Sequence, residues 1–68
     1  MESKFIQLGT NYFTREENIS TFEYHIVKQG YCIVVHGWKD GKEVPIWSAT
    51  VEKEEDAQAL LSSIRVQF

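Results

Sequence analysis

Apolar and polar residues alternate through the middle of the chain. Phe22, Tyr24 and Ile26 occupy every second position, and side chains at that spacing project from one face of a β-strand. Residues 31–35 and 44–51 are rich in β-branched and aromatic side chains, which is typical of strands. Together with two shorter apolar runs nearer the N-terminus, the pattern predicts strands at about residues 4–8, 11–13, 20–28, 31–38 and 44–51.

Glycine-containing dipeptides separate the last three predicted strands. Gln29-Gly30 and Asp40-Gly41 each lie between two apolar runs, and Asp-Gly is the strongest short-range signal for a hairpin. Two tight turns predict a meander of antiparallel strands. Pro45 has no N–H to donate to a neighbouring strand, so we expect the strand at 44–51 to lie at a sheet edge or to begin its regular pairing just after the proline. The main chain of a partner is able to pair with such an edge.

The spacing of apolar residues changes after Val51. Intervals of 3, 1, 3 and 4 residues, which mark one face of a helix, separate Ala57, Leu60, Leu61, Ile64 and Phe68. Acidic side chains at 52 and 54–56 precede this run, where the positive end of a helix dipole favours them. The pattern predicts a helix at about residues 53–65. The expected fold is α+β, with a small antiparallel sheet of three to five strands packed on one C-terminal helix in a single domain, residues 1–68.

Counting outward from the two predicted turns assigns each strand residue to one face of the sheet. Apolar side chains gather on one face, which is predicted to form the core with the helix: Phe22, Tyr24, Ile26, Ile33, Val35, Val44 and Ile46 from the strands, and Leu60, Leu61 and Ile64 from the helix. The same count places Trp47 on the opposite face, across from Val34. A slip of one residue in the register would exchange the two faces.

The opposite face is too apolar in this count to lie in water. Val34 and Trp47 occupy its centre, and soluble monomers seldom expose contiguous apolar patches of more than roughly a few hundred Å². We therefore expect a second copy of the chain, another protein, or the N-terminal hairpin to cover this face. The residues predicted to form the interface are Trp47, Trp38, Val34, His36, His25 and Glu43.

Chain length and composition favour association for a second reason. A chain of 68 residues buries only about 60% of its unfolded surface, so its margin of stability is thin. Cys32 is the single cysteine, which excludes an intramolecular disulfide and points to a reducing compartment. The sequence has neither a signal-like N-terminus nor an apolar stretch of about 20 residues. We expect a cytoplasmic protein with no membrane partner.

Candidate chemistry centres on Glu23, His25, Cys32 and His36, which project from the same side in the counted register, with Glu23 opposite His36. The closely spaced ligand pairs of zinc sites, such as Cys-x-x-Cys, do not occur. Instead of a metal ion, we expect the carboxylate of Glu23 to be the polar partner of the His36 side chain. Neither a nucleophile elbow nor a phosphate-binding glycine loop is present. The sequence therefore favours a protein without catalytic residues, metal ions or cofactors.

The favoured function is a small non-enzymatic interaction or regulatory module, acting as a homodimer or with a protein partner. Two alternatives stay open. Aromatic side chains on a sheet would stack with single-stranded nucleic acid, but the seven basic residues are scattered and the net charge is −3. Acidic residues at 16, 17, 52 and 54–56 would suit an inhibitor that occupies the basic groove of a nucleic-acid-binding protein.

Overall fold

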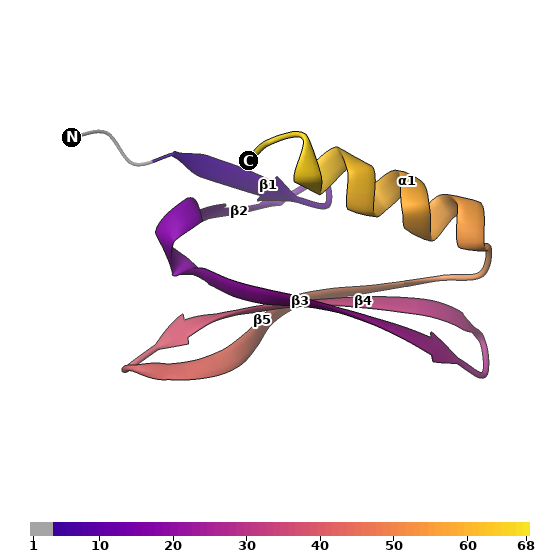
Figure 1. Ribbon diagram of the computed structural model, residues 1–68, viewed down its shortest axis with the longest axis horizontal. Helices are drawn as coiled ribbons and strands as arrows, with labels where there is room; N and C mark the ends of the chain where they lie inside the picture. The colour runs from indigo at the N-terminus through magenta and orange to yellow at the C-terminus, as the bar shows by residue number, and fades with distance from the viewer. Residues whose placement is uncertain (1–3) are drawn as a thin grey trace.

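A computed structural model describes residues 4–68 of the chain (Figure 1). The elements are, in chain order, β1 (Phe5–Leu8), β2 (Tyr12–Arg15), the 3-10 helix η1 (Glu16–Asn18), β3 (Ile19–Val27), β4 (Gly30–Lys39), β5 (Lys42–Val51) and α1 (Glu54–Arg65). The predicted α+β fold, with antiparallel strands and a C-terminal helix, is confirmed. No helix in residues 4–68 is long and apolar enough to cross a membrane.

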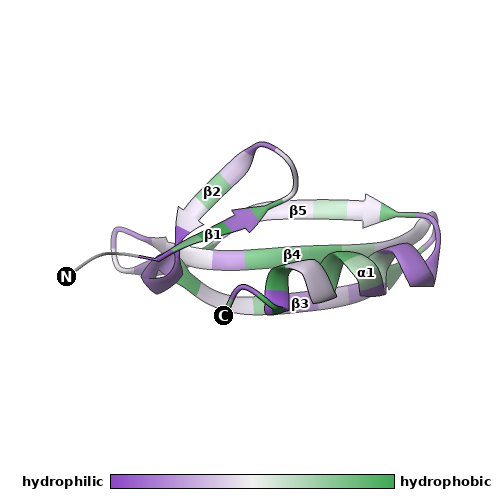
Figure 2. Ribbon diagram, turned by 90° about the horizontal axis from the view of Figure 1, so that it is seen from above, coloured by the Kyte–Doolittle hydropathy of each residue, from purple (hydrophilic) through white to green (hydrophobic). Residues whose placement is uncertain are grey.

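The strands form two separate antiparallel sheets. β1 pairs with β2, and β3, β4 and β5 form a three-stranded sheet with β4 in the centre. The β1–β2 hairpin and α1 lie together on one face of the larger sheet, here called the covered face (Figures 1 and 2). The other face is the open face. The radius of gyration is 12.4 Å, against about 11 Å for a compact chain of this length, as expected for two layers with one face left open.

The core lies between the covered face and the layer above it. Ile6 and Leu8 of the hairpin, Ile33 and Val35 of β4, and Ala57 and Ile64 of α1 are buried. Ile19, Ile46 and Trp47 are partly buried against the cluster formed by Ile6, Leu8, Val35 and Ile64. Leu60 and Leu61 are half-buried. The hairpin thus packs on the same side as α1. Of the three alternatives for covering the opposite face, the N-terminal hairpin is therefore wrong, because Ile6 and Leu8 are buried with Ile64 of α1 in one core.

The two hairpins of the larger sheet turn differently. Lys39 pairs with Lys42 around Asp40 and Gly41, whose φ angles of 52° and 76° suit the predicted two-residue turn. In the other hairpin Val27 pairs with Gly30, so the turn residues are Lys28 and Gln29, and the predicted Gln29-Gly30 turn is wrong. Gly30 has a φ of 145°, and a Cβ there would overlap the carbonyl oxygen of Val51. The main chain at Val51 approaches so closely that only a residue without a Cβ fits at position 30. The register shifts by two residues, which preserves the faces.

A β-bulge in β5 overturns the predicted position of Trp47. His36 pairs with Pro45 but Val35 pairs with Trp47, so Ile46 is an extra residue. Beyond the bulge the register differs by one residue from the count, which exchanges the faces. Trp47 therefore packs against the core, and Ser48 takes the place across from Val34. The predicted edge position of this strand is confirmed, and a proline suits both an edge and a bulge.

Three predicted core residues of β3 are wrong. Phe22, Tyr24 and Ile26 are 38%, 37% and 79% exposed. They do lie on the covered face, paired with Val35, Ile33 and Tyr31. However, α1 packs chiefly against β4, β5 and β1, and the layer above the sheet leaves every residue of β3 from Thr21 to Val27 exposed. A strand can direct apolar side chains to the correct face and still lack an element to bury them.

Candidate functional site at the outer edge of β3

The outer edge of β3 is an unpaired strand edge. β3 pairs with β4 on one side, and no other strand in residues 4–68 pairs with it. The register is regular from Phe22 to Val27, and every residue from Thr21 to Val27 is exposed. A row of main-chain donors and acceptors is therefore available to another extended segment.

The hairpin register identifies which residues supply those groups. The two-residue connection makes Val27 and Gly30 the closing pair, which exchanges hydrogen bonds in a hairpin of this length. Hydrogen-bonded and non-bonded pairs then alternate along the ladder. Val27, His25 and Glu23 direct their N–H and C=O groups toward β4. The remaining main-chain groups of the regular segment, those of Ile26, Tyr24 and Phe22, point outward.

Outward main-chain groups and apolar side chains belong to the same residues. We call Phe22, Tyr24 and Ile26 the β3 strip. The Phe22 ring meets Phe68 edge-on, with centroids 5.8 Å apart and planes at 87°, and the Tyr24 ring lies 6.0 Å from that of Tyr31. Phe68 is itself 51% exposed. The β3 strip thus forms an apolar border along the covered face, open to an incoming chain.

On the open face, Glu23 lies between two histidines. Its Oε2 is 2.8 Å from Nε2 of His25 and its Oε1 contacts Nε2 of His36. That His36 nitrogen is buried and makes no well-aligned hydrogen bond within the described chain, so the carboxylate acts as its charge partner. The hydrogen bond with His25 lowers the pKa of Glu23, and both histidines also lower it through their charge, while desolvation opposes the shift.

The predicted interface residues do not all come together. His25, Val34 and His36 share the open face, but the main-chain partner of Glu23 is Val34 rather than His36. Trp38 is 49% exposed and pairs with Glu43, whose carboxylate accepts a hydrogen bond from Ser20 Oγ. The bulge separates Trp47 from this group. In its place Ser48 and Thr50, paired with Val34 and Cys32, make the open face more polar than the count implied.

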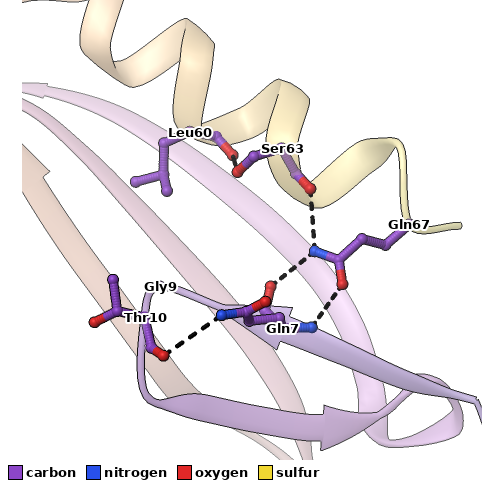
Figure 3. Close-up of a pocket in the computed structure, with 6 residues that line it drawn as sticks. All are labelled: Gln7, Gly9, Thr10, Leu60, Ser63 and Gln67. Atoms are coloured by element: carbon purple, nitrogen blue, oxygen red, sulfur yellow. Dashed lines mark hydrogen bonds between the residues drawn. The ribbon is translucent and has the colours of Figure 1, made fainter.

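A pocket of about 300 Å³ lies between α1 and the β1–β2 turn, lined by Gln7, Gly9, Thr10, Leu60, Ser63 and Gln67 (Figure 3). Its polar groups bind one another. Gln67 Oε1 accepts from the Gln7 N–H at 2.7 Å, and Gln67 Nε2 donates to the carbonyl oxygens of Gln7 and Ser63 at 2.9 and 3.0 Å. The amide of Gln67 therefore closes part of the outer edge of β1 in the way a neighbouring strand would.

Metal-binding geometry and similarity to other proteins add no functional assignment. Across residues 4–68, no group of three or more His, Cys, Asp or Glu side chains is arranged to hold a metal ion. The sequence matches no protein-family model, and no curated protein or solved structure is significantly similar to it.

Proposed function

We propose that this protein is a small non-enzymatic interaction module that binds a protein partner by adding a strand to the outer edge of β3. The observation that carries the proposal is the coincidence of outward main-chain groups with the exposed apolar side chains of the β3 strip. Strand addition uses these two features together, since main-chain hydrogen bonds supply affinity and alternate side chains supply specificity.

The distribution of apolar side chains supports this proposal. Six apolar residues of the described chain are buried, whereas ten large apolar side chains are exposed. Burial of apolar surface contributes about 25 cal/mol per Å², so an incoming strand that covers the β3 strip adds to a small core. A long, regular and apolar strand edge is also the kind that readily pairs with another chain.

The basic side chains do not favour the nucleic-acid alternative. Lys28 lies in the turn between β3 and β4, whereas Lys39 and Lys42 flank the Asp40-Gly41 turn at the other end of β4. Phosphate contacts need several basic groups along one groove. In this sheet, the length of β4 separates Lys28 from Lys39 and Lys42.

Amide exchange tests strand addition directly. The probe is an extended synthetic peptide of alternating valine and threonine with two added lysines at each end for solubility, so that it does not repeat the sequence of β3. We expect the peptide to slow hydrogen exchange at the amides of Phe22, Tyr24 and Ile26. Equal exchange of these amides with and without the peptide would show that no strand adds at this edge, and the proposed function would be wrong.

A proline variant and its matched control separate main-chain pairing from side-chain contact. Tyr24→Pro removes an outward N–H that makes no bond to β4, and proline is tolerated at such edge positions. Tyr24→Ala removes the same ring but keeps the N–H. We expect Tyr24→Pro to lose peptide binding with a retained unfolding transition, and Tyr24→Ala to bind more weakly than the wild type but still detectably.

A further inference from the structure

We infer that the strand added to β3 is β3 of a second copy of this chain, antiparallel, with Tyr24 opposite Tyr24 at the two-fold axis. This inference rests on the proposed function and names its partner. It is carried by the order of side chains along β3, which complements itself in one register and conflicts with itself in the neighbouring ones.

Hydrogen bonding restricts the available registers. In a continuous antiparallel sheet, residues whose main-chain groups point outward must face residues of the same kind. Phe22, Tyr24 and Ile26 of one copy therefore face members of the same outward set in the other copy. A two-fold axis perpendicular to the sheet also keeps the covered faces of both copies on the same side. The axis can then pass only through a pair of identical residues.

Three of the four central registers place unsuitable side chains opposite each other. An axis at Glu23 brings two carboxylates together, which is destabilising. An axis at His25 sets two histidines opposite each other and Phe22 opposite Lys28. An axis at Phe22 sets Tyr24 opposite the irregular stretch between Ile19 and Phe22. It also places Ile26, the most exposed residue of the β3 strip, opposite η1 rather than a strand.

The register centred on Tyr24 satisfies both faces. On the covered face, Phe22 lies opposite Ile26 of the second copy, twice by symmetry, and the two Tyr24 rings meet at the axis. On the open face, Glu23 lies opposite His25 of the second copy, also twice. Aromatic and β-branched pairs and opposite charges are the cross-strand pairs that stabilise antiparallel sheets. Ile26, 79% exposed in one copy, is covered by the partner's Phe22.

The cluster on the open face prepares this pairing. Glu23 and His25 already contact each other within one copy at 2.8 Å, which holds both side chains on the face where the second copy would present the same pair. Joining two such strands brings two glutamates and two histidines together on the open face. Each glutamate then has a histidine beside it on its own strand and another opposite it on the second copy. The result is a six-stranded sheet with both helices on one side.

Light scattering and single-cysteine cross-linking test the partner and the register together. We expect the mass to rise from 7.9 kDa toward twice that value between micromolar concentrations and about 0.5 mM, a range suited to a weak complex. In a Cys32→Ser background, Tyr24→Cys should then form a disulfide-linked dimer under mild oxidation, because directly opposite Cα atoms lie about 5.5 Å apart.

The matched controls are Glu23→Cys and His25→Cys. In the Tyr24-centred register, each of these cysteines lies diagonally across from the same cysteine of the second copy. The Cα atoms of such a diagonal pair are about 7–8 Å apart, too far for an unstrained disulfide. Faster cross-linking of either control than of Tyr24→Cys would overturn the register and leave the proposed function standing. A chain that stays at 7.9 kDa overturns the second copy as partner, and the amide-exchange experiment then decides the proposed function separately.

A charge exchange provides a second measurement that retains the native tyrosine. His25→Glu places two pairs of carboxylates opposite each other in the Tyr24-centred register, so we expect at least a tenfold weaker dimer. Adding Glu23→Lys restores opposite charges across the axis and should recover most of the affinity. Recovery supports the register. Failure of the folded double variant to recover affinity would overturn it, since no other central register places position 23 opposite position 25.

Discussion

The two edges of the three-stranded sheet differ in how they are protected. β5 carries Pro45 and a bulge, and Ile46 and Trp47 beside the bulge pack into the core. Pro45 and the bulge both discourage a further strand. β3 has no proline, its register shift is confined to the stretch between Ile19 and Phe22, and from Phe22 to Val27 it is regular and exposes its side chains. The comparison teaches that one sheet can combine an edge that is blunted with an edge that is left ready to pair.

The largest difference between the edges should appear in stability. We expect Trp47→Ala to cost about 2–4 kcal/mol of unfolding free energy, because it removes a ring packed on the core. That is a large fraction of the total of roughly 3–10 kcal/mol for a chain of this length. Ile26→Ala should cost about 0.5 kcal/mol or less. Urea unfolding at low micromolar concentration measures both, and an equal cost would mean that Ile26 belongs to the monomer core.

The sequence predicted the directions of side chains better than their burial. Alternation correctly placed Phe22, Tyr24 and Ile26 on the same face as Ile33 and Val35. Whether they are buried depends on how far the layer above the sheet extends, and α1 packs chiefly elsewhere. The spacing of apolar residues within a helix does not specify where that helix lies across a sheet. The exposed β3 strip was therefore mistaken for core.

The bulge was the other feature that residue counting missed. Counting assumed that pairing runs without interruption from the Asp40-Gly41 turn, and it was correct as far as the His36 and Pro45 pair. Two adjacent apolar residues, Ile46 and Trp47, follow the proline. This departure from alternation was a usable signal, because prolines in sheets occur at edges and bulges. Reading it would have placed Trp47 in the core and Ser48 on the open face.

The outer edge of β1 offers a smaller test of edge protection. Gln67 binds both main-chain groups of Gln7, and Gln67→Ala should cost about 1–2 kcal/mol by removing a partly buried amide with several hydrogen bonds. Exchange of the Gln7 amide should accelerate at the same time. Gln58→Ala, at an exposed position of α1, is the control and should leave exchange of the Gln7 amide unchanged. Unaltered exchange in Gln67→Ala would show that this amide does not protect β1.

The smallest expected effect is a change in how β3 responds to acid. The pKa of Glu23 is lowered in the folded protein, so the unfolded chain takes up a proton first as the pH falls. Stability from this group is therefore fully present above its ordinary value of 4.5 and declines as the pH drops through the lower folded value. Thermal unfolding between neutral pH and about pH 3 should show Glu23→Gln losing less stability than the wild type.

His25→Gln identifies the origin of that acid response. The hydrogen bond from His25 is the main cause of the lowered pKa of Glu23, and His36 adds to it. His25→Gln should therefore lose part of the acid-dependent stability, and Glu23→Gln should lose all that this cluster provides. If both variants followed the wild-type curve, the contacts between Glu23 and the two histidines would contribute nothing measurable in the monomer. Because these side chains are substantially exposed, water screens their interaction in one copy, and its larger effect is expected where a second strand covers them.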